Sequence, residues 1–496
     1  MRIKIYLSTI GFLILFSSCY SPTETKKQTR PNIIFLMDDQ HRWDALGVEN
    51  SAVHTPYLDH LAAEGVRFTN AVCQAPMCIP SRNSMMFGLY PNQLGVVRNG
   101  GGIPDGKLPA KPLAQLFAEA GYETAGFGKT HWGVRCSTRG FETRFAAEVF
   151  EEGAMMMKDL DPDKKQRYLD ETIDYGPGEE DPSGYLGETS ALPEGDHRDG
   201  WVLEKCLSYI KKRKDERPLF LYLSFLKPHA GHNVPAGFED LYKLEETTYA
   251  QQPPWKNDQS SHAEGVNRRA LYEGFWKKAT EDQWKEMTMR YYANCTWIDD
   301  MFGRTLKALE DKGLLENALI VYTSDHGEML GERYYRFNKY CLYDASVRVP
   351  MIFSGSALAD KWKGKLDMRP AELVDVYPTL LAAARIEIPP KAVGIGLLNP
   401  NQNRAFSFCA LHERKDEAAF MARSGNHKLI LRFDKKQDAS EYTKSDIIGG
   451  ELYDLKKDPQ EWNNLYSDAK STEIMGEMTE QLMAKLITMS CLVADI

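Results

Sequence analysis

Four apolar runs in this sequence end in charged or titratable side chains. These are Asp38 and Asp39 after 31–37, Lys129 and His131 within 122–133, Lys227 and His229 after 218–226, and Asp325 and His326 after 318–324. Adjacent carboxylates at the end of a buried strand repel each other unless a cation lies between them. Three carboxylates and a histidine therefore predict a site for a hard metal ion, and the lysines predict an anion bound beside it. For any single pair, a solvated polar turn is the alternative.

A fifth segment offers a nucleophile. Cys78 is followed by Ile-Pro-Ser-Arg82 and then by the small and apolar run 83–88, a pattern that predicts a loop entering a short helix. Free backbone N–H groups and the helix dipole at that end favour negative charge, which lowers the pKa of a thiol placed there. The alternative is a buried structural cysteine, the commoner state of a lone thiol.

These groups can act together only if the chain brings them to one place. The runs 31–37, 218–226 and 318–323 are apolar without alternation, which is typical of parallel strands covered on both faces. The carboxyl ends of such strands share one edge of an open α/β sheet, where ligands bind. Helices are predicted at 55–65 with Thr55 as N-cap and Gly65 as stop, at 198–214, and from a Thr280 capping box to Gly313.

The sequence predicts an α/β fold with a large, mixed, mostly parallel sheet sandwiched by helices and a smaller C-terminal antiparallel sheet plus helix. We expect the catalytic domain at 31–400 and a C-terminal α+β subdomain at 401–496. Short alternating strands around Gly425-Asn426 predict a hairpin, and 471–489 predicts the packed helix. The polar segment 142–196 is predicted as an excursion outside the core.

The N-terminus predicts export. Basic residues precede the apolar run 5–16, and Leu15 to Cys19 resembles a bacterial lipobox, so 1–19 is interpreted as a lipoprotein-type signal and 20–30 as a tether. We expect an exported protein of the periplasm or outer membrane, anchored by lipid on Cys19; a plain secretory signal is the alternative. Net charge −9 argues against a nucleic-acid partner. Nine cysteines without CxxC pairs predict no zinc framework, although one or two disulfides can form.

Taken in order, these blocks resemble the formylglycine-dependent sulfatases of the alkaline-phosphatase-like superfamily. The most specific match is Cys78-Ile79-Pro80-Ser81-Arg82, which fits the Cys-x-Pro-Ser-Arg signature whose cysteine becomes formylglycine. Further matches are 121–133, Lys227-Pro228-His229, Ser324-Asp325-His326-Gly327-Glu328, Asn338-Lys339 and 452–459. Thr130 and Trp132 depart from the commonest form of the second signature.

The resemblance implies a role for each site residue. Cys78, as formylglycine hydrate, would attack sulfur with one hydroxyl, His229 would protonate the departing alcohol, and His131 would accept a proton from the second hydroxyl as sulfate leaves. Calcium, or alternatively manganese, would be held by residues that include position 78 itself. The metal set is Asp38, Asp39, Cys78, Asp325 and His326. Arg82 would orient the modified residue and help to neutralise charge. The substrate would be bound by Lys129, Lys227 and Lys339 at the sulfate oxygens, and by Asn99. A formylglycine-generating or sulfatase-maturating enzyme would be a partner.

The substrate implied is a sulfate ester on a carbohydrate. The segments 227–229, 331–332 and 339–340 look similar to iduronate sulfatases, which points to a glycosaminoglycan. A phosphonate or phosphate monoester hydrolase of the same superfamily is the first alternative, because 324–331 also resembles that branch. A non-catalytic lipoprotein that binds sulfated glycans, and a hydrolase that uses the Cys78 thiol directly, are the others.

Overall fold

The computed structural model describes residues 30–100, 102–132, 137–147, 161–163, 165, 183–255, 273–412, 417–434 and 442–493. The predicted signal, most of the tether, Cys19 and Cys136 lie outside the described residues. Among the helices that are described, none has the length and apolar character needed to cross a membrane. The six cysteines whose side chains are described are free thiols: Cys73, Cys78, Cys206, Cys295, Cys341 and Cys409.

The main sheet has eight strands in the order β11-β2-β10-β9-β1-β7-β4-β5. Its centre consists of four buried parallel strands, β9 (Ala318–Ser324), β1 (Asn32–Asp39), β7 (Leu219–Pro228) and β4 (Glu123–Gly128). These are the four strands that the sequence predicts, and they are neighbours. Helices cover both faces of them, which is why their sequences are apolar without alternation.

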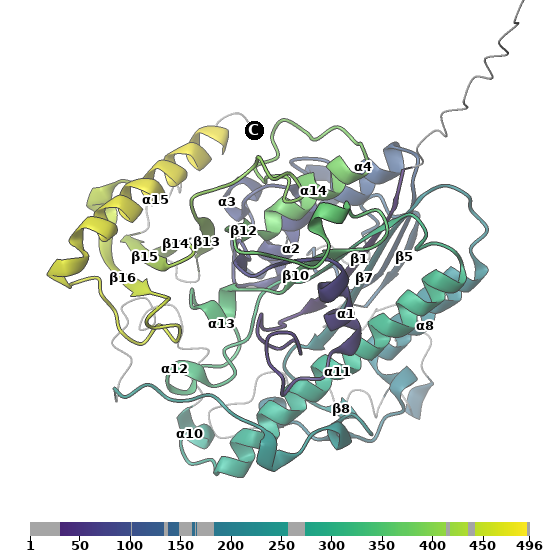
Figure 1. The fold of residues 1–496 in the computed structure, drawn as a ribbon, viewed down its shortest axis with the longest axis horizontal. Helices are drawn as coiled ribbons and strands as arrows, with labels where there is room; N and C mark the ends of the chain where they lie inside the picture. Colours follow the sequence, from purple (N-terminus) through teal and green to yellow (C-terminus); the bar gives the residue numbers. More distant parts are fainter. Residues whose placement is uncertain are drawn as a thin grey trace, which may run out of the picture.

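Successive residues of β1 point to opposite faces and separate two cores. Ile33, Phe35 and Met37 pack toward α2 (Cys78–Phe87), α4 (Leu113–Glu119) and α14 (Val376–Ala383). Ile34 and Leu36 pack toward α1 (Pro56–Glu64), α8 (Arg198–Lys212) and α11 (Glu281–Asp311), the long helix crossing the lower right of Figure 1. The period of two in the side-chain direction thus assembles a three-layer structure from one strand.

The remaining elements extend the sheet or connect it. Strands at the two sheet margins are β5 (Thr143–Ala146), β10 (Met351–Ser354), β2 (Val66–Phe68) and β11 (Lys365–Asp367). Small pairs are formed by β3 (Ala71–Val72) with β12 (Ala371–Glu372) and by β6 (Thr189–Ser190) with β8 (Val234–Pro235). Short helices are α3 (Pro91–Leu94), α7 (Ser183–Leu186), α10 (Glu273–Trp276), α12 (Glu332–Tyr335) and α13 (Asp344–Val347).

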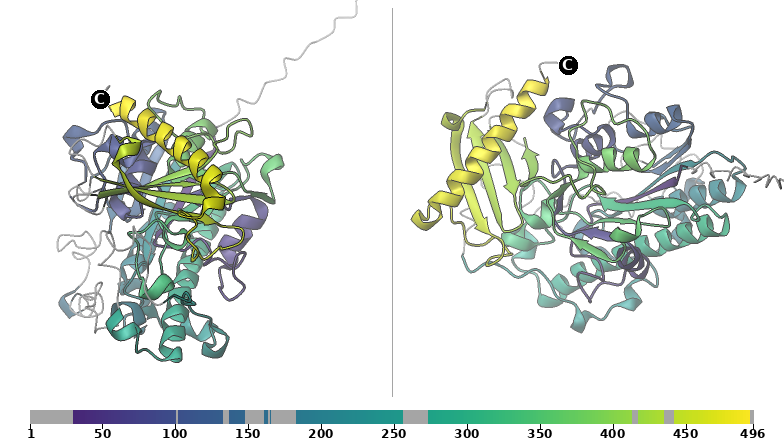
Figure 2. Two further views of the ribbon diagram at one scale, coloured as in Figure 1. Left: turned by 90° about the vertical axis from the view of Figure 1, so that its left-hand side faces the viewer. Right: turned by 45° about the horizontal axis from the view of Figure 1, so that its top comes forward.

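The C-terminal part is an antiparallel sheet of four strands in sequence order: β13 (Ser407–Leu411), β14 (Glu417–Arg423), β15 (His427–Asp434) and β16 (Ile447–Asp454). Helix α15 (Thr472–Val493) lies across one face of this sheet, as Figure 2 shows. The hairpin predicted at Gly425-Asn426 is confirmed, because Ser424 N donates to His427 O at 2.9 Å. The sequence predicted three strands here and missed β16 as the fourth.

Helix ends partly follow the sequence predictions. The Thr280 capping box of α11 is confirmed, with Gln283 N donating to Thr280 Oγ1 at 3.3 Å. Thr55 is the N-cap of α1, as predicted, but its side chain makes no capping hydrogen bond, because its hydroxyl donates to Asp59 Oδ1 at 3.0 Å. Gly65 ends α1 with φ −116°, so the left-handed region is not the reason for glycine; an added Cβ would lie 2.2 Å from Phe353 O. The segment 142–196 is not wholly an excursion, because β5 joins the main sheet.

Candidate active site

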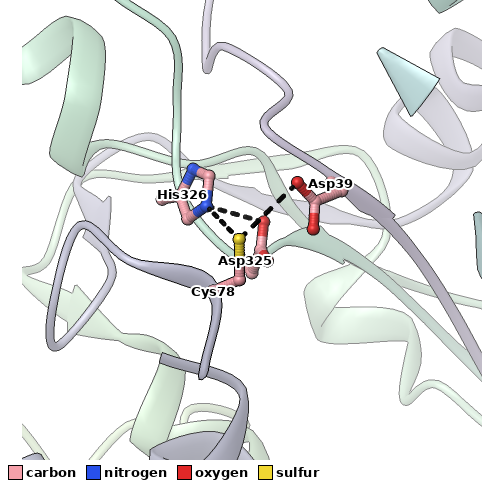
Figure 3. A group of neighbouring side chains, drawn as sticks. All are labelled: Asp39, Cys78, Asp325 and His326. Carbon is pink, nitrogen blue, oxygen red and sulfur yellow. Dashed lines mark hydrogen bonds and ion pairs between the residues drawn. The ribbon is translucent and has the colours of Figure 1, made fainter. Parts of the chain in front are cut away.

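Side chains from β1, the start of α2 and the segment after β9 meet at the carboxyl edge of the sheet (Figure 3). Asp39, Cys78, Asp325 and His326 are buried, and their potential ligand atoms all lie within 4.8 Å of one another. Cys78 Sγ lies 3.2 Å from His326 Nε2 and 3.9 Å from Asp39 Oδ1. The register of the parallel strands explains the meeting, because Asp38 pairs with Ser324 on β9 and Asp39 with Pro228 on β7.

Cys78 is the first residue of α2 and not the residue before it, since Met77 occupies the N-cap position. The next N–H of the helix, Ile79 N, donates to Asn99 Oδ1 at 3.0 Å. Asn99, the predicted substrate-binding residue, is exposed, and in this structure its oxygen satisfies one of the free N–H groups of the helix. Ser81 Oγ donates to Asp325 O at 2.6 Å and joins the helix to the metal-ligand candidates.

Arg82 is fully buried beneath this cluster and holds several strand ends together. Its Nε donates to Asp325 Oδ2 at 2.7 Å, and its Nη2 donates to Asp39 Oδ2 at 3.0 Å. Its Nη1 donates to Lys129 O and to Ser224 Oγ, each at 2.9 Å. The planar guanidinium therefore fixes one oxygen of each carboxylate, and it neutralises part of their charge.

Two lysines place positive charge beside Cys78. Lys339 Nζ lies 3.1 Å from Cys78 Sγ, and Lys129 Nζ lies 3.8 Å from Sγ and 2.6 Å from Asp39 Oδ2. Burial and Asp39 would raise the pKa of the Cys78 thiol. The positive charges of Lys129 and Lys339, together with His326, instead hold that pKa well below its usual range.

His229 approaches from the end of β7, with Nε2 3.9 Å from Asp39 Oδ1. Burial, together with Lys339, holds the pKa of the imidazole well below 6.5, although Asp39 opposes this shift. The free site therefore holds a neutral His229. The strand end is set by Asp199 in the first turn of α8, whose carboxylate accepts from Leu226 N at 2.7 Å and from Lys227 N at 2.9 Å.

The donor set fits a hard divalent cation. Carboxylates and one imidazole suit Ca²⁺ or Mn²⁺. Burial raises the pKa of Asp325 to about 6, with Asp39 adding to the rise and Arg82 opposing it, so a cation would relieve a carboxylate pair that the protein alone compensates only in part. The fifth predicted ligand, Asp38, lies outside the group of four, since its Oδ2 faces Tyr322 OH at 2.8 Å and His41 Nδ1 at 2.7 Å. Its Oδ1 is buried without a hydrogen-bond partner in the described structure, an atom that a cation would satisfy.

The remaining predicted residues lie at the same sheet edge. His131 follows β4, is partly buried and has φ 51°. Lys227 is a buried residue near the end of β7. Sequence reasoning missed Gln40 and Glu328, which are buried and bonded to each other behind Lys339. Gln40 directly follows the Asp pair and Glu328 closes the 324–328 block, but neither position carried a signal for its partner.

Most of the chain matches known proteins. Residues 31–386 match the family described as sulfatase, and residues 331–487 match the C-terminal family of N-sulphoglucosamine sulphohydrolase. The chain is 30% identical to an arylsulfatase of Clostridium perfringens over 92% of its own length and 94% of that protein. It is 29% identical to an ulvan-active sulfatase of Formosa agariphila over 96% of its own length and 85% of that protein.

The fold is similar to that of solved structures. The phosphonate monoester hydrolase of Agrobacterium radiobacter superposes with a TM-score of 0.76, covering 93% of this chain and 96% of that one at 21% identity. With the family match covering most of the chain, and an arylsulfatase related over nearly its full length, the chain belongs to the sulfatase family of enzymes.

Proposed function

We propose that this protein hydrolyses sulfate esters of a sulfated saccharide, using formylglycine at position 78 and a divalent metal ion, with Ca²⁺ the first choice and Mn²⁺ the second. The observation that supports this most strongly is the position of Cys78. Its sulfur lies within 4.8 Å of ligand atoms from Asp39, Asp325 and His326, and it lies 3.1 Å from the ammonium of Lys339. A nucleophile so placed has a metal site on one side and cations for an anionic substrate on the other.

Each protein group has a defined task in this proposal. Asp39, Asp325 and His326, with the Oδ1 atom of Asp38, would hold the metal ion, which would supply Lewis-acid charge to the reacting centre. Lys129 and Lys339 neutralise the sulfate oxygens. Their buried positions, 1% and 2% exposed, strengthen these interactions because water does not screen them.

His229 is proposed as the general acid that protonates the departing alcohol oxygen. In the free site its pKa is low because of burial and Lys339, so it is neutral. A bound sulfate ester adds negative charge beside the ring, which raises the pKa and favours the protonated form needed for this step. His131, at the end of β4, is proposed to accept the proton from the second hydroxyl at position 78 when sulfate is released.

A saccharide is proposed as the substrate because one relative along nearly the whole chain is named as ulvan-active, and the C-terminal match is to an N-sulphoglucosamine sulphohydrolase family. The segments 227–229 and 339–340, which look similar to iduronate sulfatases, favour a glycosaminoglycan among the saccharides. We further propose that the protein is exported through its N-terminal 19 residues, is anchored through Cys19, and is matured at Cys78 by a formylglycine-generating or sulfatase-maturating enzyme.

Phosphonate or phosphate monoester hydrolysis is the second candidate. It is favoured by the likeness of the fold to a phosphonate monoester hydrolase and by the 324–331 segment. Matched aryl sulfate, aryl phosphate and aryl phosphonate esters distinguish the two. A higher kcat/KM for either phosphorus ester than for the sulfate would favour this candidate over a sulfatase.

The deciding experiment starts with mature protein from a host that contains a maturating enzyme. The mass of the peptide that spans Cys78 reports its conversion, and free sulfate is measured by ion chromatography after incubation with defined sulfated mono- and disaccharides. We expect formylglycine at position 78 and sulfate release from one sugar type, with none from Cys78→Ala. An intact thiol in an active preparation would exclude the formylglycine mechanism, and fully converted protein that releases no sulfate would favour a glycan-binding role.

A further inference from the structure

A chain of buried polar contacts lies behind Lys339. Lys339 Nζ, which is 3.1 Å from Cys78 Sγ, also donates to Gln40 Oε1 at 2.7 Å. Gln40 Nε2 donates in turn to Glu328 Oε2. All of these side chains are at most 2% exposed. The chain therefore connects a carboxylate that lies away from the nucleophile to the ammonium that lies against it.

The order of donors and acceptors in this chain has only one solution. The Glu328 carboxylate can only accept hydrogen bonds, and the Lys339 ammonium can only donate them. The amide of Gln40 lies between them and must present its NH₂ to the carboxylate and its carbonyl oxygen to the ammonium. Glu328 thus decides which end of Gln40 faces Lys339, and the carbonyl oxygen of Gln40 holds the ammonium in place.

Glu328 also fixes the backbone that precedes Lys339. Its Oε1 accepts from Leu330 N at 2.9 Å and from Asn338 N, which lie at the two ends of the loop 330–338. Met329 N donates to Asn338 O at 2.8 Å and closes the same loop. One carboxylate therefore controls both the chain position of Lys339 and the direction of its head group.

The backbone of Gln40 is held in an unusual conformation that suits this task. Its φ is 67°, in the left-handed region that residues with a side chain seldom adopt. Its N–H donates to Asp325 Oδ1 at 3.1 Å, so the turn after β1 is tied to the candidate metal ligands. Strained residues of this kind persist where the surrounding structure fixes them, most often at functional sites.

We propose that Glu328 and Gln40 are positioning residues that set the Lys339 ammonium against the nucleophile at position 78 and against the sulfate oxygens. This proposal rests on the proposed function, because it assigns a task within that reaction. Neither side chain contacts Cys78 itself, so both act through Lys339.

The test reverses the order of donors and acceptors along the hydrogen bonds that link Lys339, Gln40 and Glu328. In Glu328→Gln, the new Oε1 still accepts from Leu330 N and Asn338 N, but its NH₂ faces the NH₂ of Gln40. The Gln40 amide must turn so that its carbonyl oxygen faces this NH₂ group. Its own NH₂ group then faces the Lys339 ammonium, so two donors oppose each other. The double variant Glu328→Gln/Gln40→Glu restores the order, because the new amide at position 328 donates to the new carboxylate at position 40, and that carboxylate accepts from Lys339.

We expect Glu328→Gln to lower kcat about 100-fold, the loss typical of one misplaced group that stabilises transition-state charge, with a smaller change in KM. The affinity for inorganic sulfate, measured by calorimetry, should fall as well. The double variant should recover kcat to within about tenfold of wild type and recover the sulfate affinity. Gln40→Met, which leaves the backbone bonds of Glu328 in place, should lower kcat like the single variant and gives the readout if Glu328→Gln does not fold.

Glu332→Gln is the matched control, since Glu332 lies in the same loop but pairs with Arg42; we expect its kcat to equal that of wild type. Metal content is measured for every variant. Unchanged kcat and sulfate affinity in Glu328→Gln, or a double variant no better than the single one, would overturn the positioning role while leaving the sulfatase proposal intact. The wild type, fully converted at position 78, could lack sulfatase activity while the sulfate affinity still falls in Glu328→Gln and returns in the double variant. That result would support the positioning role and overturn the proposed reaction.

Discussion

Lys129 and Asp39 form an ion pair of 2.6 Å between Nζ and Oδ2, although their strands are not neighbours in the sheet. Strand β7 lies between β4 and β1, and its Pro228 is in register with Asp39, so the ion pair spans this strand. Together with Arg82, this lysine holds the pKa of the buried Asp39 carboxyl well below its usual range against the effect of burial. The protein thus supplies part of the positive charge that a metal ion would also supply.

Replacing Lys129 with Gln should therefore have an effect on stability that depends on the metal. Removing one partner of a buried pair costs about 3 kcal/mol, because a charge stays buried with less compensation. Ca²⁺ at the same carboxylate offsets this loss, so the difference in melting temperature from wild type should be large in chelator and small in saturating Ca²⁺. Lys111→Gln, which breaks the exposed pair with Glu119, is the control and should show no difference in either condition. Equal destabilisation with and without Ca²⁺ would show that Lys129 and the metal ion do not compensate the same carboxylate.

Cys78→Ala should leave the fold nearly intact and abolish turnover. Cys78 begins α2, but the helix is fixed there by Ile79 N on Asn99 and by Ser81 Oγ on Asp325, which alanine does not disturb. We expect a melting temperature close to that of the unmodified wild type, together with sulfate release at the level of the uncatalysed reaction. Measurable turnover by a well-folded Cys78→Ala protein would show that another group is the nucleophile.

The sequence was informative wherever a strand end fixed a residue's place. Asp39 ends its strand, and Lys129, His229 and Asp325 directly follow theirs. Parallel strands in one sheet share their carboxyl edge, so the convergence of these residues could be predicted without coordinates. The pattern says less about side-chain direction. Asp38 has the same sequence context as its neighbour, yet strand alternation turns one of its oxygens toward His41 and Tyr322.

The contacts between distant loops could not be predicted. Glu328 and Gln40 lie 288 residues apart and meet because Gln40 adopts a left-handed backbone, a state that no local propensity indicates for glutamine. The edge strand β5 was missed for a related reason. Strand β5 has three of its four residues only partly buried, so its sequence lacks the continuous apolar run of the central strands.

His229 is tested through the leaving group. A general acid matters most when the departing oxygen is strongly basic, and matters little when it is a good leaving group. We expect His229→Ala to lower kcat about 10³-fold for an alkyl or sugar sulfate and much less for 4-nitrophenyl sulfate. The measurement is kcat over a series of aryl and alkyl sulfates, plotted against leaving-group pKa, which should give a steeper slope for the variant. Parallel lines for the variant and the wild type would assign the proton to a different donor.

Asp299 predicts how stability depends on pH. This carboxyl group of α11 accepts from Tyr57 N and Leu58 N in the first turn of α1, and burial raises its pKa to about 7 in spite of these bonds. The carboxyl group of the unfolded chain releases its proton near the ordinary aspartate pKa of 3.8, whereas the folded chain keeps the proton up to a pH of about 7. The unfolded state is therefore increasingly favoured as the pH rises from about 4 to 7, by about 4 kcal/mol at most.

Asp299→Asn removes this titration. Asparagine loses one acceptor for the α1 turn, which lowers stability by an amount independent of pH, so the pH dependence of the difference is the readout. We expect the variant to gain stability relative to wild type between pH 4 and 7 and to hold that gain above pH 7, measured as the difference in melting temperature. Asp311→Asn, at the exposed end of the same helix, should show a flat difference. A flat difference for Asp299→Asn as well would mean that Asp299 titrates alike in the folded and unfolded chains, and that its two backbone hydrogen bonds offset the effect of its burial.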